Sequence, residues 1–477
     1  MKPRPPLPSG PYLVVGLARS GVAAALALRA RGEEVIGCDA GAPGTGGLDG
    51  AAGRLSDAGV EVHLDASGDA LAARAGTLIK SPGVPRSALV VVAARARGIP
   101  VLGELELAWR LVPNEFVAVT GTNGKTTTTE WIGHIHREAG LLVAVVGNVG
   151  TAASSLAGAL APEATVVCET SSFQLEDTEA FAPEAAVLLN LAPDHLDRHG
   201  SYSDYVAAKL RIFINQGNHD VAVAPAELGQ SADADYLGRF GRAESPGAWQ
   251  SAGADCLGAR HHFDLGGCAR EVRFGPSPAA ELSDRAGHLW WGEEPLLRTD
   301  EISLPGEHNR RNAMAAAATC LARGIGRDDV VAGLRTFAGV AHRLELIAVR
   351  DGVSYVNDSK ATNVASTLVA LASFPSGVHL IAGGRGKQQD FSPLVTLVAE
   401  RCRAVYLIGE AAGELALALG PAGVELQDSG DLERAVAAAR KAALAGDTVL
   451  LSPACASFDQ YPDFEARGDH FRALVAH

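Results

Sequence analysis

Residues 116–126, with the sequence FVAVTGTNGKT, carry the strongest structural signal in the chain. The apolar run 116–120 predicts a buried strand, and the residues after Gly124 predict a helix over 126–139. Glycines let backbone N–H groups face phosphate oxygens, Lys125 can reach the outer phosphates, and the Thr126 hydroxyl can hold magnesium. The loop departs from the strict pattern G-x-x-x-x-G-K-[ST], since Val119 stands where the first glycine would fall. A turn without a ligand is the alternative, but strand, GKT and helix in this order favour a variant phosphate loop.

The N-terminal part has a similar strand, turn, helix and strand pattern. An apolar run over 11–15 leads into the turn 16–21 (GLARSG), and a second strand over 34–38 ends at Asp39. The turn resembles a dinucleotide fingerprint with Ala18 at the middle glycine position, and Asp39 lies near the distance of a ribose contact. Binding of NAD, binding of another nucleotide, and simple packing all remain open, and the pattern favours another nucleotide.

Strands and helices alternate through the rest of the chain, which predicts an α/β fold with parallel sheets. A helix is expected near 151–160 and a small antiparallel sheet within 221–303. The remaining strands are expected at 142–146, 165–168, 186–189, 353–356, 378–382, 404–408 and 447–451. We predict three domains: a Rossmann-like domain over 1–104, a central P-loop-type ATPase domain with a parallel sheet over 105–339, and a doubly wound C-terminal domain over 340–477.

Composition narrows the class of protein. A chain of 477 residues has room for about two to three domains. The net charge of −14 disfavours a nucleic-acid binder, which more often carries a basic face. The cysteines occur singly without zinc-ligand spacing, and no apolar run reaches the roughly 18 residues of a membrane span. We expect a cytoplasmic protein that binds neither nucleic acid nor membrane.

Lysine is rare, with seven lysines against thirty-four arginines. Arginine therefore serves as the general cation, whereas lysine offers a compact charge whose pKa and covalent state can be tuned. Four of the seven fall inside motifs that are candidates for chemistry: Lys125, Lys209, Lys360 and Lys387. Their placement marks them as candidate functional residues.

Glu169 and His195 follow expected strands that should neighbour the phosphate loop. A carboxylate is a natural magnesium ligand, and histidine is a less usual one. Either residue could be a satisfied polar group at a sheet edge, but the contexts ETSSFQ (169–174) and NLAPDHLDR (190–198) favour a site. Lys209, on an expected helix, is either a solvated lysine or part of that site.

The C-terminal part supplies further charged residues in the motifs AHRLE (341–345), NDSKATN (357–363) and GGRGK (383–387). Arg343 could neutralise charge on the γ-phosphate of ATP, and an interdomain salt-bridge set is the alternative. Lys387 could clamp the carboxylate of an incoming amino acid, and a flexible surface loop is the alternative.

Together these motifs resemble those of the Mur ligases, in the same order along the chain. They are TGTNGKT, ETSSFQLE, NLAPDHLDRHG, YVAAKLR, GEHNRRNAMAA, HRLE, NDSKATN, GGRGK and SPACASFDQY. The resemblance covers nearly the whole chain, and NDSKATN with SPACAS is most similar to members that add D-glutamate. It implies a ligase of peptidoglycan synthesis that acts on small molecules, and we expect this ligase to be a monomer. The γ-phosphate of ATP would pass to the alanyl carboxylate of UDP-N-acetylmuramoyl-L-alanine, and the amine of D-glutamate would attack the acyl phosphate.

The resemblance also implies a role for each matched residue. ATP would be bound by Gly121, Thr122, Asn123, Gly124, Lys125, Thr126, Thr127, Asn309, Asn312, Arg343 and Asp358. Two magnesium ions would be held by Thr126, Glu169, His195 and Lys209, the last as a carbamate formed with carbon dioxide. The UDP substrate would meet Arg19, Ser20, Asp39, Ser81, Asn148 and His195. D-Glutamate would meet Thr362, Lys387, Ser457 and Phe464. The catalytic residues would be Lys125, His195, Lys209 and Lys360.

Two segments depart from the family pattern, and four rival functions fit the sequence less well. The residues after Asp39 are AGAPGT, whereas the family often has a Thr-Arg pair there, and 221–300 is too divergent to map. A folylpolyglutamate synthetase-like enzyme would lack the N-terminal unit, and a diamino-acid ligase usually has an Asp-Asn-Pro-Arg loop, which is absent from the sequence. A nicotinamide dehydrogenase leaves GTNGKT unexplained, and a non-catalytic regulator should have lost part of the site.

Overall fold

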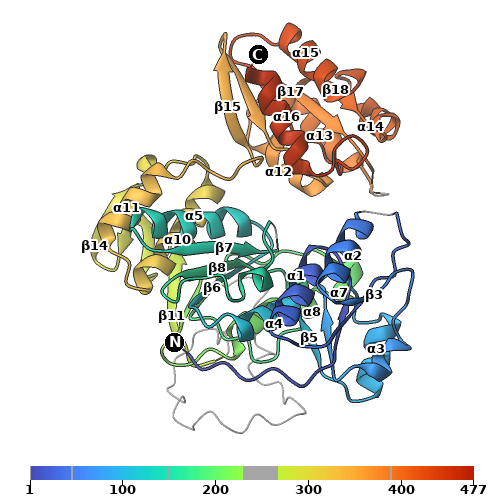
Figure 1. Ribbon diagram of the computed structural model, residues 1–477. Helices are drawn as coiled ribbons and strands as arrows, with labels where there is room; N and C mark the ends of the chain where they lie inside the picture. Colours follow the sequence, from blue (N-terminus) through green and yellow to red (C-terminus); the bar gives the residue numbers. More distant parts are fainter. Residues whose placement is uncertain (1, 45–46, 149, 229–266, 387–388, 477) are drawn as a thin grey trace. The chain divides into compact units, whose positions relative to one another are not determined.

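The computed structural model describes residues 2–44, 47–148, 150–228, 267–386 and 389–476 (Figure 1). Within these residues the strands form three sheets, and the chain divides into two compact units, residues 1–338 and 339–477. The first unit holds two sheets and the second holds one, which confirms the predicted α/β class. The three-domain division at 104 and 339 stays a prediction. Among the described residues, no helix is both long and apolar enough to cross a membrane.

The first sheet is parallel throughout and covered on both faces. Its strands, in order across the sheet, are β3 (Glu61–His63), β2 (Val35–Cys38), β1 (Tyr12–Val15), β4 (Thr77–Lys80) and β5 (Val101–Gly103). One face packs against α1 (Arg19–Ala30), α2 (Leu48–Asp57) and α4 (Glu104–Leu111). The other packs against α3 (Leu89–Ala96) and the turn η1 (Leu71–Arg74). Alternate strand residues enter the two cores, as expected of a strand buried on both faces.

Helix α4 joins the first sheet to the second. Its Leu107 lies in the core of the first sheet, whereas Leu105 and Trp109 lie in the core of the second. The second sheet has, in order, β14 (Glu294–Arg298), β13 (His288–Trp291), β12 (Leu282–Arg285), β11 (Arg270–Gly275), β10 (Val221–Pro225), β9 (Ala185–Leu188), β6 (Phe116–Thr120), β8 (Thr165–Glu169) and β7 (Val143–Gly147). From β7 to β12 neighbouring strands are parallel, so the carboxyl ends of β6, β7, β8 and β9 meet at one edge.

Helices cover both faces of the second sheet around β6. Helix α8 (Tyr202–Ile214) lies on one face, where Tyr205, Leu210 and Phe213 join the core with Trp109. On the other side α5 (Lys125–Glu138) packs against α10 (Glu307–Ala322) and α11 (Arg327–Thr336). Because helices pack on both sides of β6, its carboxyl end is fixed, and so is the start of the loop 121–124 that follows it.

One expectation for the central segment was wrong, and a second holds for only part of it. The helix expected near 151–160 is a short turn, η2 (Ala153–Leu156), and Gly158 at φ +75° leaves the helical region there. The segment 221–303 is not a separate antiparallel sheet, because β10 pairs in parallel with β9 and extends the central sheet. Within the described part of this segment, the expected antiparallel pairing is confined to β12, β13 and β14. A short, fully buried strand such as β10 needs a neighbour on each edge. Residues 229–266 lie outside the described part of the chain.

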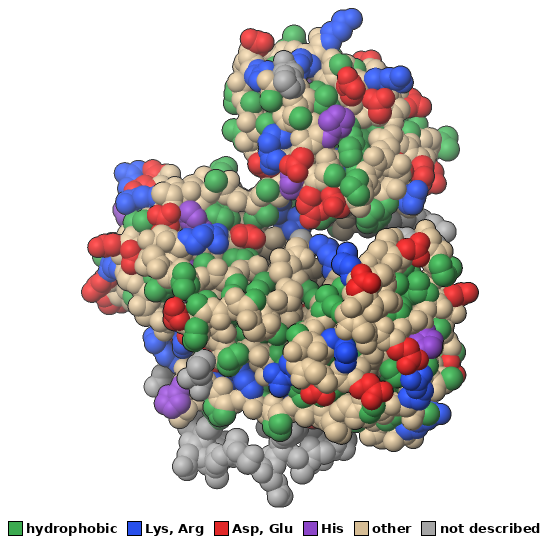
Figure 2. All heavy atoms as spheres, viewed as in Figure 1, with side chains coloured by type: hydrophobic (Ala, Val, Ile, Leu, Met, Phe, Trp, Pro, Cys, Tyr) green, Lys and Arg blue, Asp and Glu red, His purple; other side chains and the backbone are tan. Residues whose placement is uncertain are grey.

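The second unit is built on one sheet of order β15 (Glu345–Arg350), β16 (Val353–Asn357), β20 (Thr448–Leu451), β17 (Val378–Gly383), β18 (Cys402–Ile408) and β19 (Glu425–Gly430). The four inner strands were predicted, and the two edge strands were not. β19 (ELQDSG) lacks the continuous apolar run of a buried strand and is mostly exposed, whereas β15 (ELIAVR) has a short apolar run that the sequence analysis did not assign to a strand. Pairs are parallel except β15 with β16. Figure 2 shows acidic and basic side chains interspersed over the visible face.

Candidate active site

The predicted phosphate loop connects β6 to α5 as a tight turn. Gly121 has φ +149° and Gly124 has φ +84°, conformations that favour glycine. The Lys125 ammonium donates hydrogen bonds to the carbonyls of Gly121 (3.0 Å) and Thr122 (2.8 Å), so it lies over its own loop. Helix α5 starts at Lys125, and its N-terminus carries positive dipole charge. Loop, lysine and helix N-terminus together have the features expected of a phosphate-binding site.

We expect Gly124→Ala to weaken ATP binding about tenfold or more, because its φ is unfavourable for alanine and the loop amides would shift. A β-carbon there would lie 2.2 Å from Oδ1 of Asn312, a buried residue of α10. Calorimetric titration with a non-hydrolysable ATP analogue measures the effect. Gly50→Ala is the control, since no atom lies within 4 Å of its added β-carbon. Unchanged affinity in Gly124→Ala would contradict the assignment of the loop.

Glu169 ends β8 beside the loop and forms hydrogen bonds with two other residues of the predicted site. It accepts a hydrogen bond from the Thr126 hydroxyl (2.7 Å) and, at 3.5 Å, one from the Asn148 amide. Gly147 makes this approach possible, since a β-carbon there would lie 2.1 Å from the Glu169 carbonyl oxygen. The described residues contain no group of three or more His, Cys, Asp or Glu side chains placed to hold a metal. A hydroxyl and a carboxylate still suit magnesium, which keeps several water or phosphate ligands.

Lys209 of α8 is almost completely buried beneath the loop. Its side chain is 2% exposed, and its nitrogen donates to the Gly121 carbonyl (2.9 Å) and lies 4.6 Å from the Tyr205 ring centre. Burial holds the pKa of Lys209 well below its usual value, and the charge of Lys125 lowers it further against the attraction of Asp194 and Glu169. A depressed pKa favours the neutral amine, the form that reacts with carbon dioxide to give a carbamate.

His195 lies close to the site but is held differently from the other predicted residues. It precedes the short helix α7 (Leu196–His199), with φ +51°, and its side chain is half exposed. The imidazole Nε2 lies 3.4 Å from Asp194 Oδ2, and the ring packs 4.9 Å from the ring of Phe173. Within the described residues no hydrogen bond joins His195 to Glu169 or Lys209.

Asn190 belongs to the loop's surroundings but was missing from the predicted site residues. Its amide accepts from the Asn123 N–H (2.9 Å) and donates to the Asn123 carbonyl (3.0 Å), which fixes the middle of the loop. Its place directly after an expected strand, at the ligand edge of the sheet, was the available signal. Asn309, in the first turn of α10, bonds the Pro305 carbonyl (2.9 Å), and Thr127 is buried in α5.

Four of the six residues predicted to meet the UDP substrate, Arg19, Ser20, Asp39 and Ser81, lie around the turn after β1. Ser81 donates to the Gly16 carbonyl (2.6 Å), and Asp39 accepts from the Leu17 N–H (2.7 Å), so both shape the turn from inside. Arg19, at the start of α1, is exposed and reaches the Gly150 carbonyl at 3.3 Å, while Ser20 is partly exposed. The open side of this turn is therefore formed by Arg19 and Ser20.

In the second unit, Asp358 is buried directly after β16. It accepts hydrogen bonds from the Ser452 hydroxyl (2.7 Å) and the Leu344 N–H (3.2 Å). Burial raises the pKa of Asp358 to about 7, although Ser452, Arg343 and Lys360 oppose the change. Arg343 is therefore close enough to Asp358 to act on its charge.

We expect Asp358→Asn to stabilise the protein increasingly as the pH rises. The pKa of this carboxyl is about 7 in the folded state, against the ordinary value of 3.8 that we take for the unfolded state. Between these two values the folded state binds more protons than the unfolded state, so the stability of the wild type falls as the pH rises through this interval. Asparagine does not titrate. The melting temperature of the variant minus that of the wild type should be small near about pH 5 and larger by several degrees near about pH 8. A difference independent of pH would contradict the raised pKa.

The described residues predicted to meet D-glutamate lie on loops of the second unit and at the start of its last helix. The Lys360 nitrogen lies 5.9 Å from the ring centre of Phe464, which starts α16 (Phe464–Ala476), and Thr362 is partly buried two residues on. Ser457 is buried. Lys387 lies outside the described residues.

Arg467 was missed by the sequence analysis. Only 1% of it is exposed, and it donates to the carbonyls of Ser359, Cys455 and Ala456. Burial lowers the pKa of Arg467 to about 10. It ties the NDSK segment to the SPACAS segment. Since arginine is the general cation of this chain, its residue type gave no signal.

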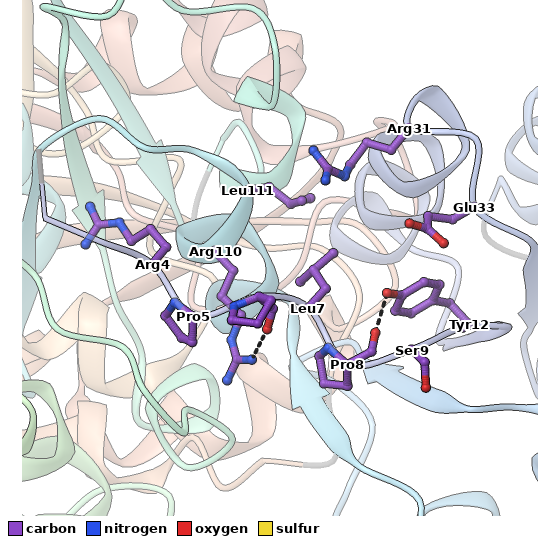
Figure 3. A pocket seen from close by; sticks show the side chains of 12 residues that line it. Arg4, Pro5, Leu7, Pro8, Ser9, Tyr12, Arg31, Glu33, Arg110 and Leu111 are labelled. Atoms are coloured by element: carbon purple, nitrogen blue, oxygen red, sulfur yellow. Dashed lines mark hydrogen bonds between the residues drawn. The ribbon is translucent and has the colours of Figure 1, made fainter. Parts of the chain in front are cut away.

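A cavity of about 530 Å³ lies away from these residues. It is formed by the proline-rich N-terminal segment and the ends of α1 and α4, and none of the predicted site residues lines it (Figure 3). Its side chains bond the segment itself: Tyr12 to the Pro8 carbonyl (2.5 Å) and Arg110 to the Pro6 carbonyl (3.0 Å). These contacts fasten the N-terminal segment to the rest of the first unit.

Comparison with known proteins identifies the family. Residues 119–236 match the Mur ligase middle domain, and residues 342–455 match the Mur ligase, glutamate ligase domain. The chain therefore belongs to the Mur ligase family, as its motifs indicated. It is 40% identical over 471 residues to the UDP-N-acetylmuramoylalanine--D-glutamate ligase of Pelotomaculum thermopropionicum, covering 97% of this chain and 96% of the relative. The ligase of that name from Anaeromyxobacter dehalogenans is 42% identical over 477 residues, covering 97% and 96%.

Solved structures support the fold. The UDP-N-acetylmuramate-alanine ligase MurC of Thermotoga maritima matches with a TM-score of 0.57 at 18% identity, covering 98% of this chain and 100% of that one. The MurF ligase of the same organism, solved in complex with ADP, matches with a TM-score of 0.53 at 17% identity, covering 85% and 90%.

Proposed function

We propose that this Mur ligase joins D-glutamate to UDP-N-acetylmuramoyl-L-alanine, with conversion of ATP to ADP and phosphate, in peptidoglycan precursor synthesis. The observation that carries the proposal is similarity over 97% of the chain to relatives named for that reaction. The site supports it, because the phosphate loop, the Thr126–Glu169 pair and the buried Lys209 lie together at one sheet edge. Cytoplasmic location and a monomeric state stay predictions.

The phosphate loop would place ATP for transfer of its γ-phosphate. An alanyl carboxylate oxygen attacks the γ-phosphorus, the bond to the β-phosphate oxygen breaks, and ADP leaves. The Lys125 ammonium, which now bonds two loop carbonyls, would exchange them for phosphate oxygens and neutralise the charge that develops on them. The amine of D-glutamate then attacks the acyl carbon, loses a proton, and phosphate departs.

Magnesium would supply charge neutralisation at the transferred phosphate. The residues proposed to hold two ions are Thr126, Glu169, His195 and Lys209. As an ammonium Lys209 would repel a cation, whereas its carbamate would present anionic oxygen. The lowered pKa of Lys209 supports this modification, since the neutral amine is the reactive form.

The second unit is proposed to bind the amino acid through Lys360, Thr362, Lys387, Ser457 and Phe464. D-Glutamate carries a side-chain carboxylate in addition to its α-carboxylate, so cationic groups here would favour it over neutral amino acids. Arg343 and Asp358 are proposed to act on the nucleotide instead.

Phosphate release tests the proposal. Purified protein receives ATP, magnesium and UDP-N-acetylmuramoyl-L-alanine, with D-Glu, L-Glu, L-Lys or no amino acid. We expect release that depends on D-Glu. Release with another amino acid would assign the chain to a sister reaction of the family, and no release under any condition would favour a non-catalytic regulator.

A further inference from the structure

A buried lysine outside the predicted site joins the two sheets of the first unit. Lys80 ends β4, its side chain is 0% exposed, and it donates to the Val84 carbonyl at 2.7 Å. Its nitrogen lies 2.6 Å from Asp177 Oδ2 and 3.9 Å from Glu176 Oε1. Both carboxylates directly follow the short helix α6 (Ser172–Leu175), which comes after β8 of the second sheet. A lysine so deeply buried between carboxylates fixes the distance between the elements that carry them.

Arg198 reaches the same turn from the opposite side. Its guanidinium donates to the carbonyls of Pro82 (3.0 Å), Val84 (3.3 Å) and Gly83 (3.5 Å). It also donates to Glu176 Oε1 at 3.0 Å. We call this group the turn clamp, because it holds residues 81–84 against the elements of the second sheet. The turn clamp consists of Lys80, Glu176, Asp177 and Arg198.

The turn clamp is continuous with His195. Arg198 stands on α7, the helix that begins directly after His195, and its guanidinium carbon lies 4.3 Å from the ring centre of Phe173. The His195 imidazole packs on that same ring, while His199 bonds the Ser172 hydroxyl at 3.0 Å. The position of α7, and with it the direction of the exposed His195 side chain, is thus set from the turn 81–84.

We infer that Lys80 and Arg198 are positioning residues that hold His195 in place and make its position depend on the ligand bound at the turns 16–21 and 81–84. The two turns are bonded directly, since the Ser81 hydroxyl donates to the Gly16 carbonyl. A uridine diphosphate group seated there displaces or tightens 81–84, and the turn clamp passes that shift to α7. The inference rests on the proposed function for its ligand, UDP.

The first measurement follows the imidazole of His195 without metal, ATP or turnover. Protein labelled with ¹⁵N at histidine is titrated with UDP, and the His195 signals are assigned by their loss in His195→Ala. We expect UDP to shift these signals in the wild type and in Lys2→Met, but not in Lys80→Met. Lys2→Met is the matched control, because it removes a lysine–aspartate pair of equal length (Lys2–Asp220, 2.6 Å) that is not part of the turn clamp.

The second measurement is a double-mutant cycle on kcat. Lys80→Met is expected to lower kcat about 10- to 100-fold, because small misplacements of a catalytic group have effects of that size. In the His195→Ala background the same change should lower kcat by less than about twofold, whereas a merely structural role gives losses that multiply. Arg198→Met, at a side chain 19% exposed, replaces Lys80→Met if that variant does not fold.

The outcomes separate this inference from the proposed function. A wild type without D-Glu-dependent phosphate release overturns the function, while the UDP titration still reports the coupling. A His195 shift that persists in Lys80→Met, or a kcat loss undiminished in His195→Ala, overturns the inference and leaves the function in place.

Discussion

Lys125→Ala should lose about 10³-fold or more in kcat/KM for ATP, measured as D-Glu-dependent phosphate release. Lys125 is the cation of the loop, and its ammonium lies within hydrogen-bond distance of the carbonyls at 121 and 122. It is therefore placed where we propose that the outer phosphates bind. Alanine removes the charge that offsets the charge developing on the transferred phosphate, and no neutral group of the loop can replace it.

Lys441→Ala is the matched control for Lys125→Ala. Lys441 is exposed on α15 (Leu432–Ala442) and belongs to no motif, so its loss should change kcat/KM by less than about twofold. Circular dichroism should show that both variants remain folded. Near-normal turnover by Lys125→Ala would contradict the placement of ATP at this loop.

Lys209→Ala should be nearly inactive, and a short carboxylic acid such as acetate should restore part of its activity. The truncation leaves a small buried space beneath the loop, where an added carboxylate can supply the anionic oxygens attributed to the carbamate. The loss should reach about 10²- to 10³-fold, the usual effect of removing a group that stabilises developing charge.

Two controls make the rescue specific. Acetate should not restore Lys125→Ala, since the missing group there is a cation. Wild-type protein equilibrated with ¹³C-labelled carbon dioxide should give a carbamate signal in the carbon spectrum, and Lys209→Ala should lack it. Full activity of Lys209→Ala without acetate would rule out a required carbamate.

Much of the architecture could be predicted from the sequence because its strands are short apolar runs that end in polar motifs. The phosphate loop, Glu169 and Asn148 were expected at one sheet edge, and the hydrogen bonds of Glu169 to Thr126 and Asn148 place them there. Periodicity predicted the inner strands for the same reason, since burial on both faces leaves a continuous apolar signal.

The remaining features depend on contacts between distant residues. The edge strand β19 is polar and mostly exposed, so its sequence resembles a loop. In the sequence, Lys80 looks like an ordinary lysine at the end of a strand. Its partner Asp177 is 97 positions later, and only the fold brings Asp177 Oδ2 to 2.6 Å from the Lys80 nitrogen. The direction of the His195 side chain depends on the positive φ of His195 and on the contacts of Arg198 with the turn 81–84, and apolar patterning specifies neither.

The measurement that tests the central claim most directly follows oxygen from the acceptor carboxylate. UDP-N-acetylmuramoyl-L-alanine labelled with ¹⁸O in the alanyl carboxylate is incubated with ATP, magnesium, D-Glu and the protein, and the released phosphate is analysed by mass spectrometry. Transfer of the γ-phosphate to the carboxylate predicts one ¹⁸O atom in each phosphate released. Phosphate without ¹⁸O, or release of AMP and pyrophosphate instead, would contradict the account.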